Sequence, residues 1–331
     1  MDSKPINQPR CLGKLPRLGV GLALAALLLS SAAFAEDPKL ALEEAADKLV
    51  LKRGEVVLAT YYLSHPEVRR PFYAHLSLPS GISVTRHFPP REGKDAVDHP
   101  TMHPGIWLAF GDVDGIDFWR HKGEIRHERF VERPSLKDSV CRFTVRNQYV
   151  FGNGDRMALI ATEVCRHEIR VQENQVLLLL DSQIGGTSEV KPLVFGDQEE
   201  MGLGVRVATP LCVKGGSGEI LSSEGKRNEK EAWGRQADWC DYRGRIEDAQ
   251  VGLLLVPHPK NFRRSWFHVR DYGLMVANPF AQNAFTGGEK SRLEIKPGEN
   301  LRLRFAIWLH QEKPGETPDP TAILKEFAEQ E

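Results

Sequence analysis

After residue 40 the chain consists of short apolar runs that turn residues interrupt at close intervals. Residues 48–52 and 55–62 are two such runs on either side of Gly54, and they predict a β-hairpin. Residues 40–48 contain alanine and glutamate, so a short helix is an alternative there. The continuous apolar run at 177–180 is typical of a strand at the centre of a sheet.

The same pattern continues to the end of the chain. Further strands are predicted at residues 70–76, 82–86, 106–110, 139–145, 157–167, 175–181, 202–208, 249–256, 274–277 and 301–309. A helix is indicated at residues 320–330, because Asp319 can cap it and Pro320 suits its first position. No repeat of 20 to 50 residues is visible, which excludes a propeller or solenoid. The pattern therefore predicts an all-β fold, a large antiparallel β-sandwich with a short C-terminal helix.

The first 35 residues have the pattern of a signal peptide. A positively charged start precedes an apolar run at 18–29, and Ala33 and Ala35 fit a small-x-small cleavage rule. We expect cleavage before Glu36, a single domain over residues 36–331, and a periplasmic or secreted protein without membrane contact after cleavage. A retained N-terminal anchor is the alternative.

The composition limits the possible classes of partner but does not decide whether the cysteines form disulfides. The net charge is −1 and no basic run is present, which argues against nucleic acid as a partner. Cys141, Cys165, Cys212 and Cys240 follow the signal, with no C-x-x-C spacing for structural zinc. Disulfides and unpaired buried thiols are both compatible with this spacing. The sequence does not define the oligomeric state.

One predicted strand near residue 268 carries three ionisable side chains of different character. Alternation places His268 and Arg270 on one face and Phe267 and Val269 on the other, and Asp271 follows at the strand's end. An edge strand with a solvated face and a surface salt bridge is the simpler interpretation.

Two upstream segments add further candidates. A loop shaped by prolines carries Asp98, His99 and His103 and leads into a predicted strand that contains Trp107. Imidazoles beside a carboxylate can transfer protons, but H-x-x-x-H outside a helix is a weak metal motif. Glu199 precedes another strand, where a carboxylate can be a general base. Histidines that bond only backbone, and a solvated acidic turn, are the alternatives.

Several motifs together resemble the family labelled PmoA or DUF6807. They lie at residues 98–100, 103–107, 110–112, 117–119, 195–199, 233–234, 239–242, 267–274 and 277–280. The family is similar to galactose-mutarotase-like supersandwiches, a resemblance that implies a sugar-binding cleft lined by His, Arg, Asp and Glu. Its PmoA label implies a copper-dependent oxygenase, which we keep as a disfavoured alternative. Where the family pattern reads His-His-Arg, this chain has Met102-His103-Pro104.

These patterns lead to one hypothesis for the site. The predicted catalytic residues are His103, Glu199 and His268, with Glu199 as base and a histidine as acid. The predicted substrate-binding residues are His99, Trp107, Arg270 and Asp271. We expect a small-molecule or oligosaccharide ligand, a sugar or sugar acid, and neither cofactor nor metal. Whether the protein is an enzyme, such as an epimerase, lyase or hydrolase, or a non-catalytic glycan-binding module stays open at this point.

Overall fold

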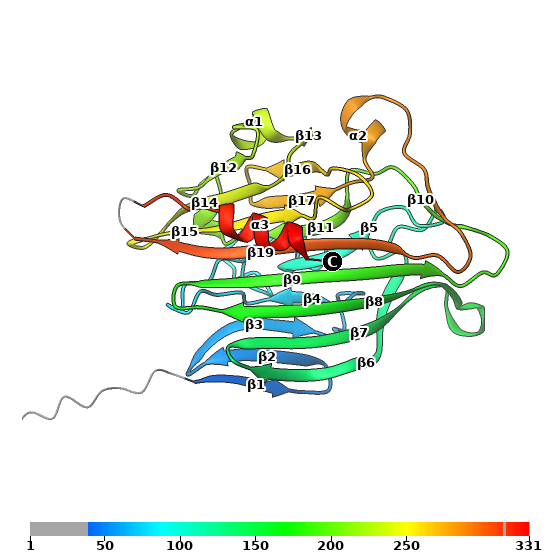
Figure 1. Cartoon of the computed structure of the whole chain (residues 1–331), viewed down its shortest axis with the longest axis horizontal. Helices are drawn as coiled ribbons and strands as arrows, with labels where there is room; N and C mark the ends of the chain where they lie inside the picture. Colours follow the sequence, from blue (N-terminus) through cyan, green and yellow to red (C-terminus); the bar gives the residue numbers. More distant parts are fainter. Residues whose placement is uncertain (1–38, 314–315, 331) are drawn as a thin grey trace, which may run out of the picture. The chain divides into compact units, whose positions relative to one another are not determined.

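A computed structural model describes residues 39–313 and 316–330, and two large antiparallel sheets form the framework of this part of the chain (Figure 1). The signal peptide predicted at 1–35 lies outside the described residues. The larger sheet has nine strands in the order β1 (Leu40–Glu44), β2 (Lys48–Arg53), β3 (Val56–Tyr62), β4 (Phe72–Ala74), β5 (Ile106–Phe110), β11 (Met201–Arg206), β17 (Leu274–Asn278), β16 (Trp266–Arg270) and β13 (Arg235–Gln236).

The second sheet has eight strands, most of them longer than those of the first, and faces the viewer in Figure 1. Its order is β12 (Glu219–Ser222), β14 (Cys240–Ile246), β15 (Ala249–Pro257), β19 (Leu301–Glu312), β9 (Gln175–Gly186), β8 (Ala158–Val171), β7 (Val140–Phe151) and β6 (Glu124–Lys137). A small ribbon pairs β10 (Leu193–Phe195) with β18 (Leu293–Ile295). The predicted central strand is confirmed, because β9 lies between β19 and β8.

The inner faces of the two sheets form one apolar core. Leu203 and Phe267 of the nine-stranded sheet belong to the same buried cluster as Phe143, Leu178 and Phe305 of the eight-stranded sheet. Strand alternation explains this, because every second side chain points inward. Each fully buried side chain of this size contributes roughly 1.5–3 kcal/mol of apolar transfer free energy. Other polar residues of the same strands lie on the outer faces, where a site can form.

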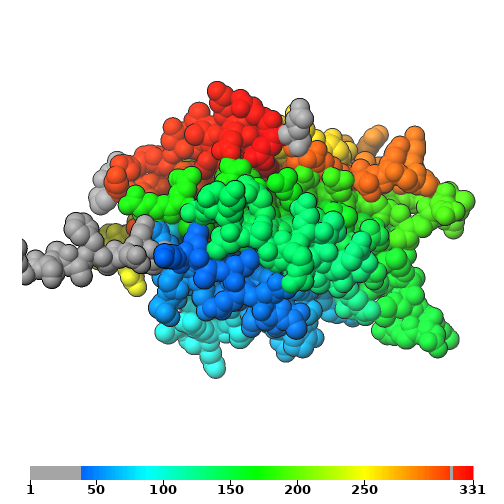
Figure 2. Space-filling model, turned by 60° about the horizontal axis from the view of Figure 1, so that its bottom comes forward, coloured from blue at the N-terminus to red at the C-terminus, as the bar shows by residue number. Residues whose placement is uncertain are grey.

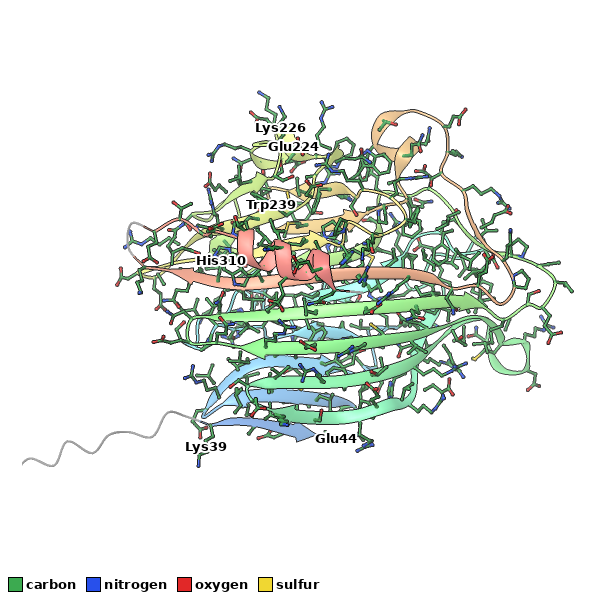
Figure 3. The ribbon with its side chains drawn as sticks, in the orientation of Figure 1. Lys39, Glu44, Glu224, Lys226, Trp239 and His310 are labelled. Carbon is green, nitrogen blue, oxygen red and sulfur yellow. The ribbon has the colours of Figure 1, made fainter. Side chains whose placement is uncertain are left out.

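Helix is confined to short segments among the described residues. α3 (Thr321–Glu329) confirms the predicted C-terminal helix, and Asp319 accepts a hydrogen bond from the Thr321 amide at 3.0 Å. Its Phe327 packs with Trp308 on the outer face of the eight-stranded sheet, next to Trp239, which Figure 3 labels. Figure 2 shows this C-terminal segment in red on the surface.

Two other helices are shorter still. α1 (Asn228–Ala232) and α2 (Gln282–Thr286) have five residues each and lie in connections between strands. None of the helices in the part of the chain that the structure describes has the length and apolar character needed to cross a membrane.

The predicted all-β antiparallel sandwich is therefore correct, and some local predictions need correction. The possible helix at 40–48 is wrong: this segment forms β1 and the start of β2, which pair with each other. The pattern also missed β6, whose charged, mostly exposed residues hide its alternation. The four cysteines from Cys141 to Cys240 are buried and free, which settles the question of disulfides among them.

Candidate functional site

The candidate site lies on the outer face of the nine-stranded sheet, where four neighbouring strands place one row of residues side by side. Trp107 of β5 pairs with Gly204 of β11, Gly204 pairs with Val276 of β17, and Val276 pairs with His268 of β16. Because strands lie about 4.8 Å apart, the row spans roughly 14 Å from Trp107 to His268. The sheet thus brings together residues that are 161 positions apart in the sequence (268 minus 107).

Gly204 makes room for the aromatic end of this row. A Cβ atom at that position would lie 2.6 Å from the Trp107 ring and 2.9 Å from the Trp119 ring. Because Gly204 has no side chain, the indole rings of Trp107 and Trp119 can pack against its backbone, with ring centroids 5.2 Å apart. Trp107 is consequently buried, and its predicted role in stacking on a ligand is disfavoured by this position.

A three-ring stack rises from the sheet at Trp107. His103 lies parallel to Trp107 at 5.2 Å and 10°, and His99 covers His103 at 4.9 Å and 25°. His103 is 1% exposed, and neither of its ring nitrogens has a hydrogen-bond partner. Burial, with the positive charges of nearby groups adding to it, lowers the pKa of His103 to about 2. His103 is therefore a neutral imidazole at physiological pH.

Arginines hold the loop that carries this stack. Arg86 donates to four backbone carbonyls between residues 96 and 103, among them that of His103 at 2.9 Å. Arg206 forms a bidentate ion pair with Asp98 at 2.8 and 2.9 Å. Burial alone would raise the pKa of Asp98, but hydrogen bonds from Arg206 and His99 keep it well below its usual range. The loop is thus a fixed part of the site.

The opposite end of the row brings Glu199, His268 and Arg270 together. The Glu199 carboxylate lies 4.0 Å from His268 Nε2 and 3.8 Å from the Arg270 guanidinium. Arg270 Nε donates to His268 Nε2 at 3.0 Å, and His268 Nδ1 lies 3.4 Å from the Glu199 carbonyl. Asn278 also donates to that carbonyl at 3.0 Å. The segment before β11 is therefore anchored over β16 and β17.

Both nitrogens of His268 are occupied in this arrangement. Its Nε2 accepts a hydrogen bond from Arg270 Nε, as an unprotonated ring nitrogen does, and burial lowers the pKa of His268 to about 4. The proton-donor role predicted for His268 stays a prediction, and these contacts favour a role in positioning Arg270 and Glu199 instead. By contrast, the Glu199 side chain is 41% exposed and accessible to a ligand.

The short helix α1 supports Arg270 from the side. The Arg270 guanidinium pairs with Glu229 of α1 at 2.8 Å and lies 5.5 Å above the Trp233 ring. Asp271 and Glu229 exchange hydrogen bonds, each accepting the other's amide, at 2.9 and 3.0 Å. Asp271 is therefore placed as a residue that fixes α1 to the end of β16.

Sequence reasoning missed two residues of this cluster, Glu200 and Arg120. Arg120 forms ion pairs with Glu200 and, at 2.9 Å, with Asp117. Burial raises the pKa of Glu200 above its usual value, although Arg120 opposes the shift. Glu199 and Glu200 are thus adjacent carboxylates, one more exposed and one more buried. The run of acidic residues was visible in the sequence, but nothing in the sequence indicated that Glu199 would be the more exposed of the two and Glu200 the more buried.

One group of residues has the ligand types of a metal site. The ligand atoms of Asp98, His99 and His103 lie within 4.8 Å of one another. However, Arg206 occupies both Asp98 oxygens, and Arg86 also lies 3.6 Å from one of them. Positive charge already compensates this carboxylate, so the set fits a cation poorly. The copper chemistry that the PmoA label implies has no well-suited ligand set in this group.

Comparison with known proteins places the chain in a family. The profile of DUF6807, a family of unknown function, matches residues 48–320, so the chain belongs to this family. No curated protein matches the chain. Among solved structures, a galactose mutarotase related enzyme from Lactobacillus acidophilus is similar over 82% of this chain and 97% of its own, with 10% identity and a TM-score of 0.28. At that TM-score the similarity supports no statement about activity.

Proposed function

We propose that this protein is exported, binds a sugar or sugar acid on the outer face of the nine-stranded sheet, and acts on it by acid–base chemistry. The convergence of Glu199 with His268 and Arg270 within 4.0 Å supports the proposal, because Glu199 comes from the segment before β11 whereas His268 and Arg270 come from β16. Adjacent carboxylates, planar guanidinium donors and imidazoles are groups that bind sugar hydroxyls and move their protons.

The chemical roles follow from exposure and hydrogen bonding. Glu199 is the base, because its carboxylate is accessible and, within residues 39–313 and 316–330, has no closer ion-pair partner than His268 and Arg270 near 4 Å. Glu200 is the proton donor, because its raised pKa favours the protonated form more than that of an ordinary glutamate. Arg120 and Arg270 orient hydroxyl or carboxylate groups through their planar forks. His268 positions Arg270.

A non-catalytic glycan-binding module is the second candidate. Arg120, Arg270 and Arg206 all form ion pairs with carboxylates in the protein, an arrangement that also suits a rigid binding face. Turnover separates the two proposals, because a binding module retains ligand affinity without forming product.

Isothermal titration with a panel of neutral and acidic sugars, followed by product analysis with NMR, tests the proposal. Arg270→Lys should weaken binding on the order of tenfold, because the single ammonium loses the fork that spans His268, Glu229 and Glu199. Arg264→Lys is the matched control, since Arg264 also pairs with two carboxylates, Asp238 and Glu224, but outside the cluster. Equal weakening by both variants, or no sugar binding by the wild type, contradicts the proposal.

A further inference from the structure

Three buried guanidinium groups lie at the base of the three-ring stack, and two of them share one ion-pair partner. Arg70, Arg86 and Arg206 are each 1–2% exposed. Asp98 is the one carboxylate that forms ion pairs with any of them among the described residues, and it serves both Arg86 and Arg206. Arg70 therefore has no ion-pair partner among the described residues, although Asp117 and Glu200 lie near enough to favour its charged form. Buried charge without a counterion is energetically costly, so a protein retains it rarely and for a reason.

Arg70 is the clearest case. Its guanidinium donates only to backbone carbonyls, those of Trp119 at 2.8 Å, Phe118 at 3.5 Å and Met102. It lies over the Trp107 and Trp119 rings at 5.5 and 6.0 Å, and burial lowers the pKa of Arg70 to about 9. These contacts orient the side chain, but they do not neutralise it.

The same cluster holds unused hydrogen-bond donors. The Nε atoms of Arg70 and Arg206 are buried without a partner, and so are both nitrogens of His103. Buried polar groups in folded proteins are nearly always paired, so several orphans in one cluster need an explanation. Every orphan here is a nitrogen, and a neutral His103 ring carries one N–H. Arg70 Nε, Arg206 Nε and one His103 nitrogen are donors, whereas the other His103 nitrogen is an acceptor, so most of the missing partners are acceptors. Arg70, which has no ion-pair partner among the described residues, favours an acceptor that is negatively charged.

We propose that Arg70, His103 and Arg206 form an anion subsite that receives the carboxylate of an acidic sugar. The sugar part of this inference rests on the proposed function, whereas the anion part rests on the charge and the orphan nitrogens. A cation is disfavoured at the same residues, because the guanidinium groups of Arg70 and Arg206 would repel it.

His99 is the outermost ring of the stack and covers the subsite. Its side chain is 44% exposed, and its one polar contact within the cluster joins Nδ1 to Asp98 at 3.1 Å. Its backbone is left-handed, with φ of 47°, a conformation uncommon for a residue other than glycine. A rotation of this exposed ring would uncover His103 without disturbing the buried arginines. The Arg206 guanidinium lies 4.6 Å from the centre of the Tyr272 ring.

His103→Phe is a sharp test, because it keeps the flat ring on Trp107 and removes two nitrogens that have no partner in the protein. The thermal midpoint should therefore stay the same or rise, while anion binding is lost. His167→Phe is the matched control. It also removes a buried imidazole stacked on an aromatic ring, Phe143 at 4.6 Å and 13°, but it lies in the core between the sheets.

The assay is titration calorimetry in phosphate-free buffer with D-glucuronate, D-glucose, acetate, sulfate and Zn²⁺. We expect wild type and His167→Phe to bind glucuronate at least tenfold more tightly than glucose. His103→Phe should abolish this preference, and His99→Ala, a change on the surface, should weaken glucuronate binding severalfold. Binding of acetate or sulfate that requires His103, without any sugar binding, would retain the subsite and refute the sugar function.

Other outcomes overturn the subsite itself. Equal affinity of the wild type for glucose and glucuronate leaves a sugar site without an anion subsite. Stoichiometric Zn²⁺ binding that His103→Phe abolishes, with no anion bound, makes the cluster a metal site. A glucuronate preference that survives in His103→Phe at full strength places the carboxylate elsewhere.

Discussion

Acidification should weaken the fold through His268, and the effect can be worked out from the structure. In the unfolded chain this histidine binds a proton below its ordinary pKa of about 6.5. In the folded protein burial and Arg270 lower the pKa of His268 to about 4. Between these two values the unfolded state binds more protons, so the free energy of unfolding falls as the pH decreases. Between pH 7.5 and pH 5 this single group removes about 2 kcal/mol.

The contact geometry explains why the folded state resists protonation. His268 Nε2 accepts the Arg270 Nε–H at 3.0 Å, and a proton on that nitrogen would oppose the donor directly. His268→Gln removes the titrating ring and keeps an amide oxygen that can accept from Arg270. Its stability should therefore decline by about 2 kcal/mol less than that of the wild type over the same pH interval.

Guanidinium chloride unfolding at pH 7.5, 6.5, 5.5 and 5.0, at constant ionic strength, measures this difference. His167→Gln is an independent comparison, because burial lowers the pKa of His167 to about 3 in the core between the sheets. The two substitutions share no partner, so their effects on the pH dependence should add. Parallel pH profiles for wild type and His268→Gln would refute the reasoning, because they would show that His268 titrates alike in both states.

Three further predictions concern the rest of the molecule. Carboxylates around His310, which Figure 3 labels, raise its pKa to about 9. The wild type therefore gains stability from protonated His310 below pH 6.5 and loses it as the pH rises towards 9. Asp241→Asn should remove this stability, which unfolding measured as a function of pH will show. Gly204→Ala should destabilise the protein by about 1–3 kcal/mol in urea unfolding, because its methyl group overlaps the Trp107 ring, and an unchanged midpoint would contradict that packing. The exported protein should begin at Glu36, and four thiols should react with Ellman's reagent after denaturation but none before it, whereas a retained N-terminus would add Cys11 as a fifth.

The sequence predicted the fold wherever local pattern and tertiary packing agree. Strand alternation assigned Phe267 and Val269 to one face and His268 and Arg270 to the other, and the first pair lies in the core between the sheets. The long strand β6 was missed because both of its faces are largely solvated, so its sequence lacks the apolar period on which the prediction depends.

The candidate site was predictable only in part, because its geometry depends on sheet order. Glu199 and His268 were expected to face each other, and their polar atoms lie 4.0 Å apart. Trp107 was expected to face a ligand, but the absence of a side chain at Gly204, two strands away from His268, determines that it is buried. A local sequence pattern does not predict which residue lies beside another on a neighbouring strand. Arg120 was missed for the same reason, since its partner Glu200 is 80 residues away.

The central proposal is that Glu199 moves a proton on a bound sugar, and one comparison tests it most directly. For a sugar that the wild type converts, the turnover number and dissociation constant of Glu199→Gln are measured by NMR product analysis and titration calorimetry. Loss of the base should lower turnover on the order of a hundredfold or more, while the amide keeps affinity within a few fold. Turnover by Glu199→Gln at the wild-type rate would contradict the proposal.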